Sequence, residues 1–315
     1  MVDFPHMRYF LSCDWGTTRF RLRLVEQKSR RIVSEITSPQ GIQVLASQHP
    51  AITTRHQAME SELAQAIVTL GVAEQIEIPL VISGMVSSTL GWHSLPYACV
   101  PAKLDGRSFI FQDLLIAGRN VRLVSGLRTE CDVMRGEETE LVGIFSSPER
   151  QVLSEHCVVI LPGTHSKHVY LRNGNIIDFT TFLTGELYQI LRSNSTLGLP
   201  GESTFATEPF LVGVQTSRQL GLSAALFKTR SRNVLGHLPA NHTTAFLSGA
   251  LIGAELSTLK GIVTKTIVLA ASEELSRPYA LALSELLPEI EVVRIPAPEM
   301  NIATVPGHAL LLTYP

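Results

Sequence analysis

The stretch RYFLSCDWGTTRFRLRLV, residues 8–25, decides the fold. Residues 8–13 form a short apolar run of strand type, and residues 20–25 alternate apolar with basic side chains, as a half-buried strand does. Between them, residues 14–18 read Asp-Trp-Gly-Thr-Thr and predict a tight turn. A third strand is expected over residues 31–37, so the chain begins with an antiparallel meander of three strands.

The same pattern returns in the second half of the chain. An apolar strand is predicted over residues 158–161, and Pro-Gly-Thr-His-Ser at 162–166 forms the turn that follows it. A second strand covers 167–171. Asn173-Gly174 is the strongest short signal for a hairpin, and it leads into a third strand over 176–181. A meander with a Gly-Thr turn in its first hairpin therefore occurs twice.

The remaining periodicity mixes helices with strands in both halves. Helical spacing predicts helices over 53–70, 136–145, 184–193, 208–226, 242–259 and 276–286, with a last helix beginning near residue 302 or 307. Further strands are expected over 80–83, 121–125, 266–271 and 291–295. The polar segment 146–155, which contains a proline, is the expected boundary. We therefore expect two α/β domains, over residues 1–145 and 146–315, each with a sheet covered by helices.

Composition excludes several classes of protein. A net charge of -2 is too near neutral for a nucleic-acid binder or a polybasic membrane anchor. No apolar run reaches the roughly 18 residues of a membrane helix, and the first residues lack the apolar core of a signal peptide. We therefore expect a cytoplasmic protein with no membrane partner. Its four cysteines are expected to be reduced thiols.

The first Gly-Thr turn suits phosphate binding. Gly16 lets the backbone approach a phosphate closely, while the N–H groups and hydroxyls of Thr17 and Thr18 can donate to its oxygens. Asp14, at the end of the first strand, is well placed to hold Mg²⁺ through water. An ordinary hairpin turn is the alternative. The second turn, at Gly163-Thr164, favours a clamp on a polyphosphate, and the chain contains no Walker loop.

A kinase also needs a carboxylate that orients and deprotonates the attacking hydroxyl. Arg135-Gly136-Glu137-Glu138-Thr139 lies at the end of the first half, where such a group is expected. Simple capping of a helix by Glu137 and Glu138 is the alternative, since the helix dipole favours acidic residues there. Arg135 is a candidate to bind a substrate carboxylate, or else it pairs with one of the glutamates.

The chain resembles the 2-dehydro-3-deoxygalactonokinase family. The segments that carry the resemblance follow family order over nearly the whole chain: DWGTT (14–18), SGMVSSTLGW (83–92), VMRGEETELVG (133–143), LPGTHSKHV (161–169), FLTGELYQIL (182–191) and FLSGALIGAE (246–255). The resemblance implies two ribonuclease H-like domains of the hexokinase–actin type around an interdomain cleft. It also implies ATP- and Mg²⁺-dependent phosphorylation of 2-dehydro-3-deoxy-D-galactonate at its 6-hydroxyl, a step of galactonate degradation.

The resemblance also assigns roles. Asp14 would organise Mg²⁺ through water, and Glu137 is the first choice of base with Glu138 in reserve. The residues expected to bind the nucleotide are Gly16, Thr17, Thr18, Gly163, Thr164, His165, Lys167 and Ala271. Those expected on the side of the sugar acid are Gly84, Met85, Ser87, Trp92 and Arg135, although Trp92 and Met85 would also suit a core.

Two departures bear on these roles. Pro162 stands before the second Gly-Thr turn, where broader sugar kinases usually carry an acidic residue. The segment 268–273, VLAASE, lacks the glycines usual beside adenine, which puts nucleotide affinity in question. A non-catalytic sugar-acid sensor and a polyphosphate or ATP hydrolase on the same fold remain alternatives. The sequence does not distinguish the galactonate from the gluconate epimer, and its apolar helix positions suit either a homodimer or the core.

Overall fold

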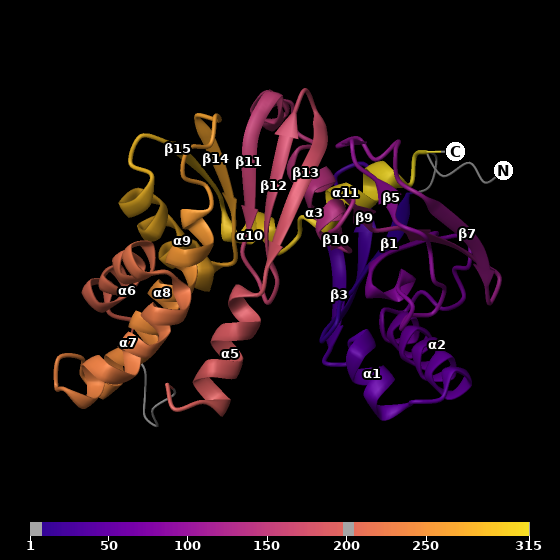
Figure 1. The fold of residues 1–315 in the computed structure, drawn as a ribbon. Coiled ribbons are helices and arrows are strands. Elements are labelled where there is room, and N and C mark those ends of the chain that lie inside the picture. Colours follow the sequence, from indigo (N-terminus) through magenta and orange to yellow (C-terminus); the bar gives the residue numbers. More distant parts are fainter. Residues whose placement is uncertain (1–7, 198–204, 315) are drawn as a thin grey trace. The chain divides into compact units, whose positions relative to one another are not determined.

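The computed structural model describes residues 8–197 and 205–314. By contacts the chain divides into two compact units (Figure 1). The first unit comprises Met1–Glu155, Arg172–Asp178 and Ile302–Pro315, and the second comprises His156–Leu171 and Phe179–Asn301. Within the described ranges, no helix is both long and apolar enough to cross a bilayer.

A six-stranded sheet organises the first unit, in the order β3-β2-β1-β4-β8-β7. Its strands are β1 (Tyr9–Trp15), β2 (Phe20–Glu26), β3 (Ile32–Ser38), β4 (Leu80–Gly84), β7 (Phe111–Ile116) and β8 (Arg119–Val124). The first three form the predicted antiparallel meander, and β4 and β8 continue the sheet in parallel with β1. This order, extended by β7, is that of a ribonuclease H-like domain, as the sequence predicted.

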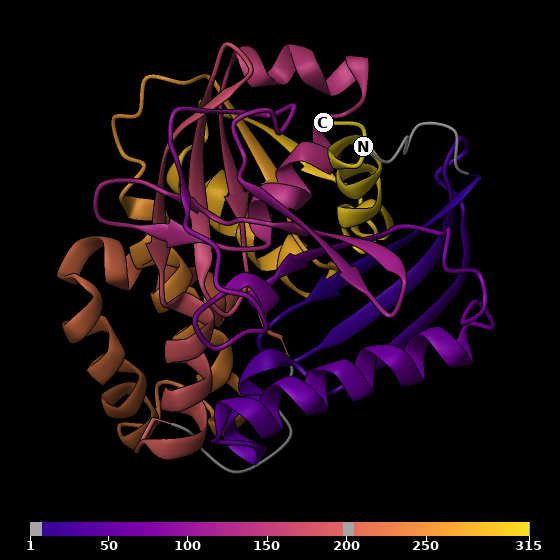
Figure 2. The same ribbon diagram turned by 90° about the vertical axis from the view of Figure 1, so that its right-hand side faces the viewer.

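Alternation along the strands gives the sheet two buried faces. Leu11, Cys13 and Trp15 point into a core covered by α1 (Ile42–Gln48) and α2 (Ile52–Thr69). On the opposite face, the hydroxyl of Ser12 lies 2.8 Å from Nδ1 of His308, in α11 (Thr304–Leu311). Figure 2 shows α2 in purple and α11 in yellow on either side of the indigo strands.

Helix α11 comes from the end of the chain and packs on α3 (Glu137–Ile144). The contact is close because both helices carry glycine there: a Cβ on Gly143 would overlap the carbonyl of Ala303, and one on Gly307 would overlap that of Thr139.

The sequence placed residues 302–315 in the second half, whereas by contacts they belong to the first unit. The assignment of a sugar-acid side and a nucleotide side to residues 1–145 and 146–315 stays a prediction.

The smaller elements of the first unit lie around this framework. A second sheet has the order β10-β9-β5, and its strands are β5 (Ala98–Cys99), β9 (Leu127–Arg128) and β10 (Val133–Met134). The remaining elements are the helices η2 (Met85–Ser87), α4 (Pro148–Gln151) and η3 (Val152–Glu155) and the strand β6 (Ala102–Lys103).

The second unit repeats the arrangement with the strand order β15-β14-β11-β12-β13. These strands are β11 (His156–Leu161), β12 (Ser166–Arg172), β13 (Asn175–Phe182), β14 (Thr266–Ala270) and β15 (Glu291–Ile295). β14 runs parallel to both β11 and β15. The predicted hairpin turn is present at Asn173-Gly174, both with positive φ, and β13 then pairs at its start with β6.

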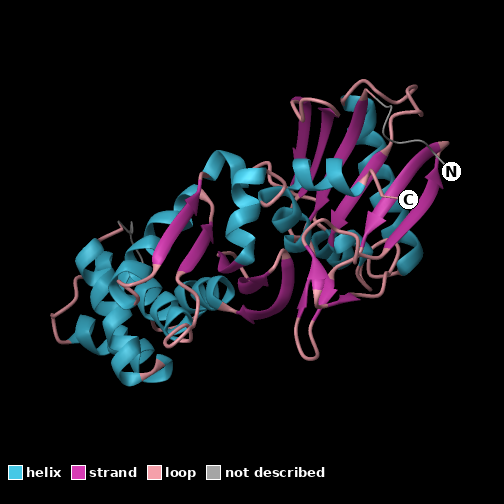
Figure 3. Ribbon diagram, turned by 90° about the horizontal axis from the view of Figure 1, so that it is seen from above, coloured by secondary structure: helices cyan, strands magenta, loops and turns pink. Residues whose placement is uncertain are grey.

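Helices dominate the rest of the second unit (Figure 3). They are α5 (Thr184–Asn194), α6 (Thr207–Leu220), α7 (Leu222–Val234), η4 (Ala240–His242), α8 (Thr243–Ser257), α9 (Glu273–Leu286) and α10 (Ala297–Met300). The core lies between the sheet and α6, α8 and α9, around Ile160, Leu269 and Leu283. The single helix predicted over 208–226 is wrong. Gly221 has φ of 77° and ends α6, so the chain turns before α7 begins.

Candidate active site

The first Gly-Thr turn is held on the start of a helix. The N–H of Gly16 donates to the carbonyl of Arg19 at 2.9 Å, which closes the turn between β1 and β2. The carbonyls of Gly16 and Thr17 accept from the N–H groups of Ile42 and Gln43, at 2.9 and 3.0 Å. A Cβ on Gly41 would overlap the carbonyl of Thr17, so only glycine allows this approach. Thr17 is half-buried and Thr18 is exposed, so both can reach a ligand.

The second Gly-Thr turn is built in the same way, in the second unit. The carbonyl of Thr164 accepts from the N–H of Glu186, in the first turn of α5, at 2.9 Å. A Cβ on Gly185 would overlap the carbonyl of Gly163. Both predicted turns are therefore fixed by a helix start that carries a glycine, and each turn has an exposed threonine, Thr18 in the first and Thr164 in the second.

The residues after the second turn differ in access. Thr164 and His165 are exposed, and Nε2 of His165 lies 2.6 Å from Oε2 of Glu186. Lys167 is buried within β12, with only 4% of its surface exposed. Ala271 is also buried and follows the end of β14, just before Ser272 at the N-cap position of α9. Gly163, Thr164 and His165 can therefore contact a ligand directly. Lys167 is buried inside β12, and Ala271 is buried just after β14.

Three glutamates lie in the first turn of α3, in the first unit together with Asp14. Glu137 is half-buried and accepts from the backbone N–H of Arg135 at 3.0 Å. Glu138 is fully buried and accepts from the N–H of Gly136 at 2.7 Å. Asp14 lies 3.7 Å from Nη1 of Arg21. Glu137 is thus the more accessible of the two candidate bases.

Crowding of carboxylates changes their protonation. Burial raises the pKa of Glu138 to about 8, with a further contribution from the charge of Glu137. The pKa of Glu140 is also raised to about 8, by burial and then by the charge of Asp14. The pKa of Asp14 is raised by burial too, although the guanidinium of Arg21 opposes the shift. At neutral pH the carboxyl groups of Glu138 and Glu140 therefore keep their protons, and a bound cation would favour their ionised forms.

The predicted sugar-side residues form a loop next to this cluster. Gly84 ends β4 with φ of 92°, and a Cβ there would lie 2.7 Å from the carbonyl oxygen of Trp15. A Cβ on Gly136 would lie 3.6 Å from Cα of Gly84, so the start of α3 meets the end of β4. Met85 follows, half-buried, in η2. This close approach places the loop beside Glu137.

Ser87, Trp92 and Arg135 stabilise this loop. The guanidinium of Arg135 donates to the carbonyl of Ser87 at 2.6 Å and to that of Leu95 at 3.3 Å, and it stacks over the ring of Tyr97 at 4.2 Å. Ser87 is buried and donates to the carbonyl of Val124. Trp92 is 5% exposed and packs in the core. Direct contact of these three with a substrate stays a prediction.

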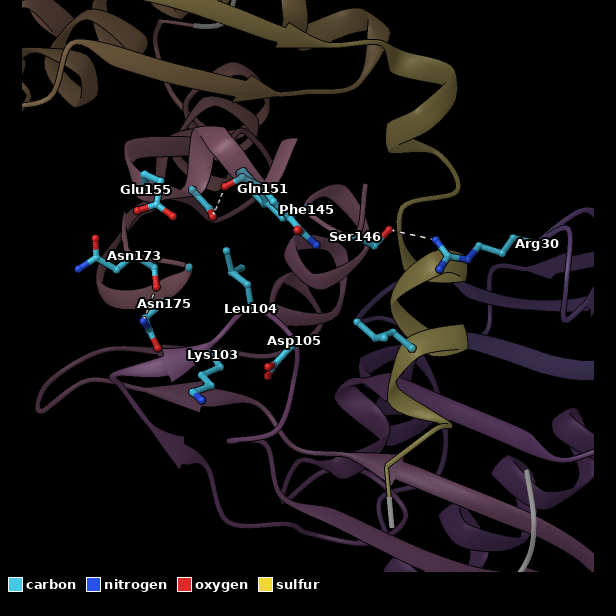
Figure 4. A pocket seen from close by; sticks show the side chains of 13 residues that line it. Arg30, Lys103, Leu104, Asp105, Phe145, Ser146, Gln151, Glu155, Asn173 and Asn175 are labelled. Atoms are coloured by element: carbon cyan, nitrogen blue, oxygen red, sulfur yellow. Dashed lines mark hydrogen bonds between the residues drawn. The ribbon is translucent and has the colours of Figure 1, made fainter. Parts of the chain in front are cut away.

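Described residues of the first unit line a polar and an apolar cavity. A polar cavity of about 470 Å³ has the charged side chains of Arg30, Lys103, Asp105 and Glu155 in its lining, and Nη1 of Arg30 donates to Ser146 at 3.1 Å (Figure 4). An apolar cavity of about 540 Å³ is lined by Trp92 and residues of α2 and β8. In the described part of the chain, the carboxylate cluster at Asp14 and Glu137 lines neither of them.

The sequence reasoning missed Arg21 and Glu140. Alternation in FRLRLV and the pairing of the hairpin place Arg21 directly opposite Asp14 in the β1–β2 register. Glu140 follows Glu137 by three residues, and residues three apart share a helix face. Both signals were present in the sequence. The burial that distinguishes Glu137 from Glu138 depends instead on packing.

The raised pKa values predict a pH-dependent stability. Because the folded chain keeps protons on Glu138 and Glu140 that the unfolded chain releases above about pH 4.5, the free energy of unfolding falls as pH rises toward 8. We expect the melting temperature, measured without Mg²⁺, to drop by several degrees between pH 6 and pH 8.5. Glu138→Gln should reduce this slope, whereas Glu74→Gln, an exposed control, should leave it unchanged. Equal slopes in both variants would contradict the assignment.

Comparison with known proteins identifies the family. Residues 14–303 match the model of the family described as 2-keto-3-deoxy-galactonokinase. The chain is 33% identical over 287 residues to the 2-dehydro-3-deoxygalactonokinase of Escherichia coli (strain K12), covering 88% of this chain and 90% of that protein. It is 32% identical over 262 residues to a Rhizobium meliloti (strain 1021) protein provisionally given the same name, with 79% of each covered.

A solved structure agrees in fold. The crystal structure of a Sinorhizobium meliloti protein, provisionally named as a 2-dehydro-3-deoxygalactonokinase, superposes with a TM-score of 0.80 at 28% identity. The match covers 98% of this chain and 100% of that one. The resemblance seen in the sequence is thereby confirmed, and the chain belongs to the 2-keto-3-deoxy-galactonokinase family.

Proposed function

We propose that this protein transfers the γ-phosphoryl group of ATP to the 6-hydroxyl of 2-dehydro-3-deoxy-D-galactonate, giving the 6-phosphate and ADP in galactonate degradation. Membership of the kinase family supports the reaction. The observation that carries the proposal is the pair of Gly-Thr turns, each fixed in the same way by a helix start with a glycine. Backbone N–H groups in such turns bind phosphate oxygens.

The carboxylates of the first unit fit a magnesium ion. Mg²⁺ prefers oxygen ligands and is usually held by one or two carboxylates together with water and substrate phosphates. Asp14 and Glu140 can supply such carboxylates. Burial is the main cause of their raised pKa values, and the charge of Asp14 adds to it at Glu140, so a bound cation would favour the ionised form of both groups. Among the described residues there is no preformed group of three or more metal ligands, so the phosphates of ATP would complete the coordination. Bound there, the ion would neutralise phosphate charge.

The remaining roles follow from access. Gly16, Thr17 and Thr18 would bind phosphates from the first unit, and Gly163, Thr164 and His165 from the second. The oxygen of the 6-hydroxyl would bond to the γ-phosphorus while the bond between this phosphorus and the bridging oxygen of ADP breaks. Glu137 would accept the proton that the hydroxyl loses. Glu138 is buried, so we assign it to the support of the α3 start. Arg135 would hold the loop that begins at Gly84.

The test is ADP release with Mg-ATP and one of three additions: the galactonate compound, its gluconate epimer, or no acceptor. We expect turnover with the galactonate compound alone. Equal turnover with both epimers would keep the kinase and broaden its specificity. Release without any acceptor would favour a hydrolase, and no release under any condition would favour a sensor. A cytoplasmic location and a homodimer stay predictions.

A further inference from the structure

A buried carboxylate lies at the centre of a polar network in the second unit. Glu255, in α8, is 3% exposed. Its oxygens accept from the hydroxyl of Ser166 at 2.7 Å and from that of Tyr279 at 2.8 Å, and they lie 3.0 Å from Nε2 of His168. The hydroxyl of Thr184 donates as well. Four side chains from β12, α5 and α9 therefore converge on one residue of α8.

Such a group is costly in a core. Removing a carboxylate from water is unfavourable unless hydrogen bonds satisfy it, and well-packed apolar residues often stabilise a core as well or better. Here the donors satisfy both oxygens, and burial raises the pKa of Tyr279 well above its ordinary value, so its hydroxyl stays a donor. Nδ1 of His168 is left buried without a partner. We therefore expect the network to position a nearby segment of the chain, in addition to any contribution to stability.

The segment that the network around Glu255 positions is the second Gly-Thr turn. Ser166 is the first residue of β12 and follows the turn directly. Thr184 is the first residue of α5 and precedes Gly185, which touches the carbonyl of Gly163. Glu255 is thus bonded both to the strand that leaves the turn and to the helix start on which the turn rests.

The first turn has an additional side-chain hydrogen bond. There the indole N–H of Trp15, the residue before Gly16, donates to the carbonyl of Gln40 at 2.9 Å and so fixes the approach to α1. The corresponding residue before Gly163 is Pro162, which has no side-chain donor. The second turn therefore lacks a side-chain hydrogen bond like that of Trp15. The bonds of Glu255 to Ser166 and Thr184 hold it instead.

We propose that Glu255 is a positioning residue for nucleotide binding, which holds residues 162–165 in the conformation that binds the phosphates of ATP. The inference rests on the proposed function, in which this turn binds phosphate. It acts through the turn and not by contact with the nucleotide. Its loss should therefore weaken binding of the nucleotide and leave binding of the sugar acid unchanged.

The experiment measures the Kd of Mg-ADP by calorimetry and both KM values for Glu255→Gln. An amide nitrogen cannot accept, so the two side chains that share one carboxylate oxygen lose their acceptor. We expect the Kd and the KM for ATP to rise about tenfold or more, with the KM for the sugar acid within about twofold. Leu256→Ala is the matched control, because Leu256 is fully buried in the same helix. It should lower the melting temperature without changing the Kd.

A second pair of variants covers the case in which Glu255→Gln fails to fold. Thr184→Val removes the hydroxyl at the start of α5 and should raise the Kd severalfold. Thr216→Val, the same change in α6 outside the network, removes a bond to the carbonyl of Val212 and should not. Equal effects of Glu255→Gln and Leu256→Ala on the Kd, or of Thr184→Val and Thr216→Val, would overturn the inference. Wild-type protein that binds Mg-ADP but does not phosphorylate the sugar acid would overturn the proposed substrate alone.

Discussion

Replacing Glu137 by glutamine should lower kcat by about 10²–10⁴-fold, the range expected when a general base is lost. The amide still accepts the backbone N–H of Arg135, so the start of α3 should keep its conformation. Because the change removes proton acceptance and not a phosphate contact, the Kd for Mg-ADP should stay within about twofold. Steady-state ADP release and calorimetry measure the two quantities.

Glu138→Gln is the matched control for that change. Glu138 is fully buried, and its raised pKa keeps it protonated at neutral pH, so glutamine resembles the state it already has. We expect kcat within a fewfold of wild type and an unchanged or higher melting temperature. If Glu138→Gln abolished turnover while Glu137→Gln did not, the base would have to be reassigned to Glu138.

The sequence alone does not tell which of Glu137 and Glu138 is accessible. Both glutamates were visible as candidates, and the helix start explained why acidic residues stand there. Consecutive residues on a helix face different directions, and which direction is buried depends on α11, a segment more than half the chain away. The choice between them therefore required the packing of the first unit.

Features that depend on residues close together in the sequence could be predicted. The hairpin at Asn173-Gly174 and the pairing of β1 with β2 depend on residues close in sequence, so alternation and turn chemistry suffice. The break at Gly221 was also a local signal, but apolar spacing on both sides concealed it. The network around Glu255 joins residues far apart in the chain, and no spacing in the sequence indicates it.

Replacing Asp14 by asparagine should lower kcat/KM for Mg-ATP by about 10²–10³-fold, as expected when a preorganised electrostatic contact is lost. Asp14 is the second-last residue of β1, close to the first Gly-Thr turn, and asparagine keeps its shape while removing the charge that would hold Mg²⁺. The Mg²⁺ concentration for half-maximal rate should rise. Glu140→Gln, which changes the second candidate ligand, should raise it less.

The same substitution should not weaken the fold. Burial raises the pKa of Asp14, which means that its charge is held at a cost in the folded chain. Removing that charge should leave the melting temperature without Mg²⁺ unchanged or higher, so activity and stability would move in opposite directions, as they do at functional sites. A folded variant whose Mg²⁺ requirement matched wild type would exclude Asp14 as the residue that holds the ion.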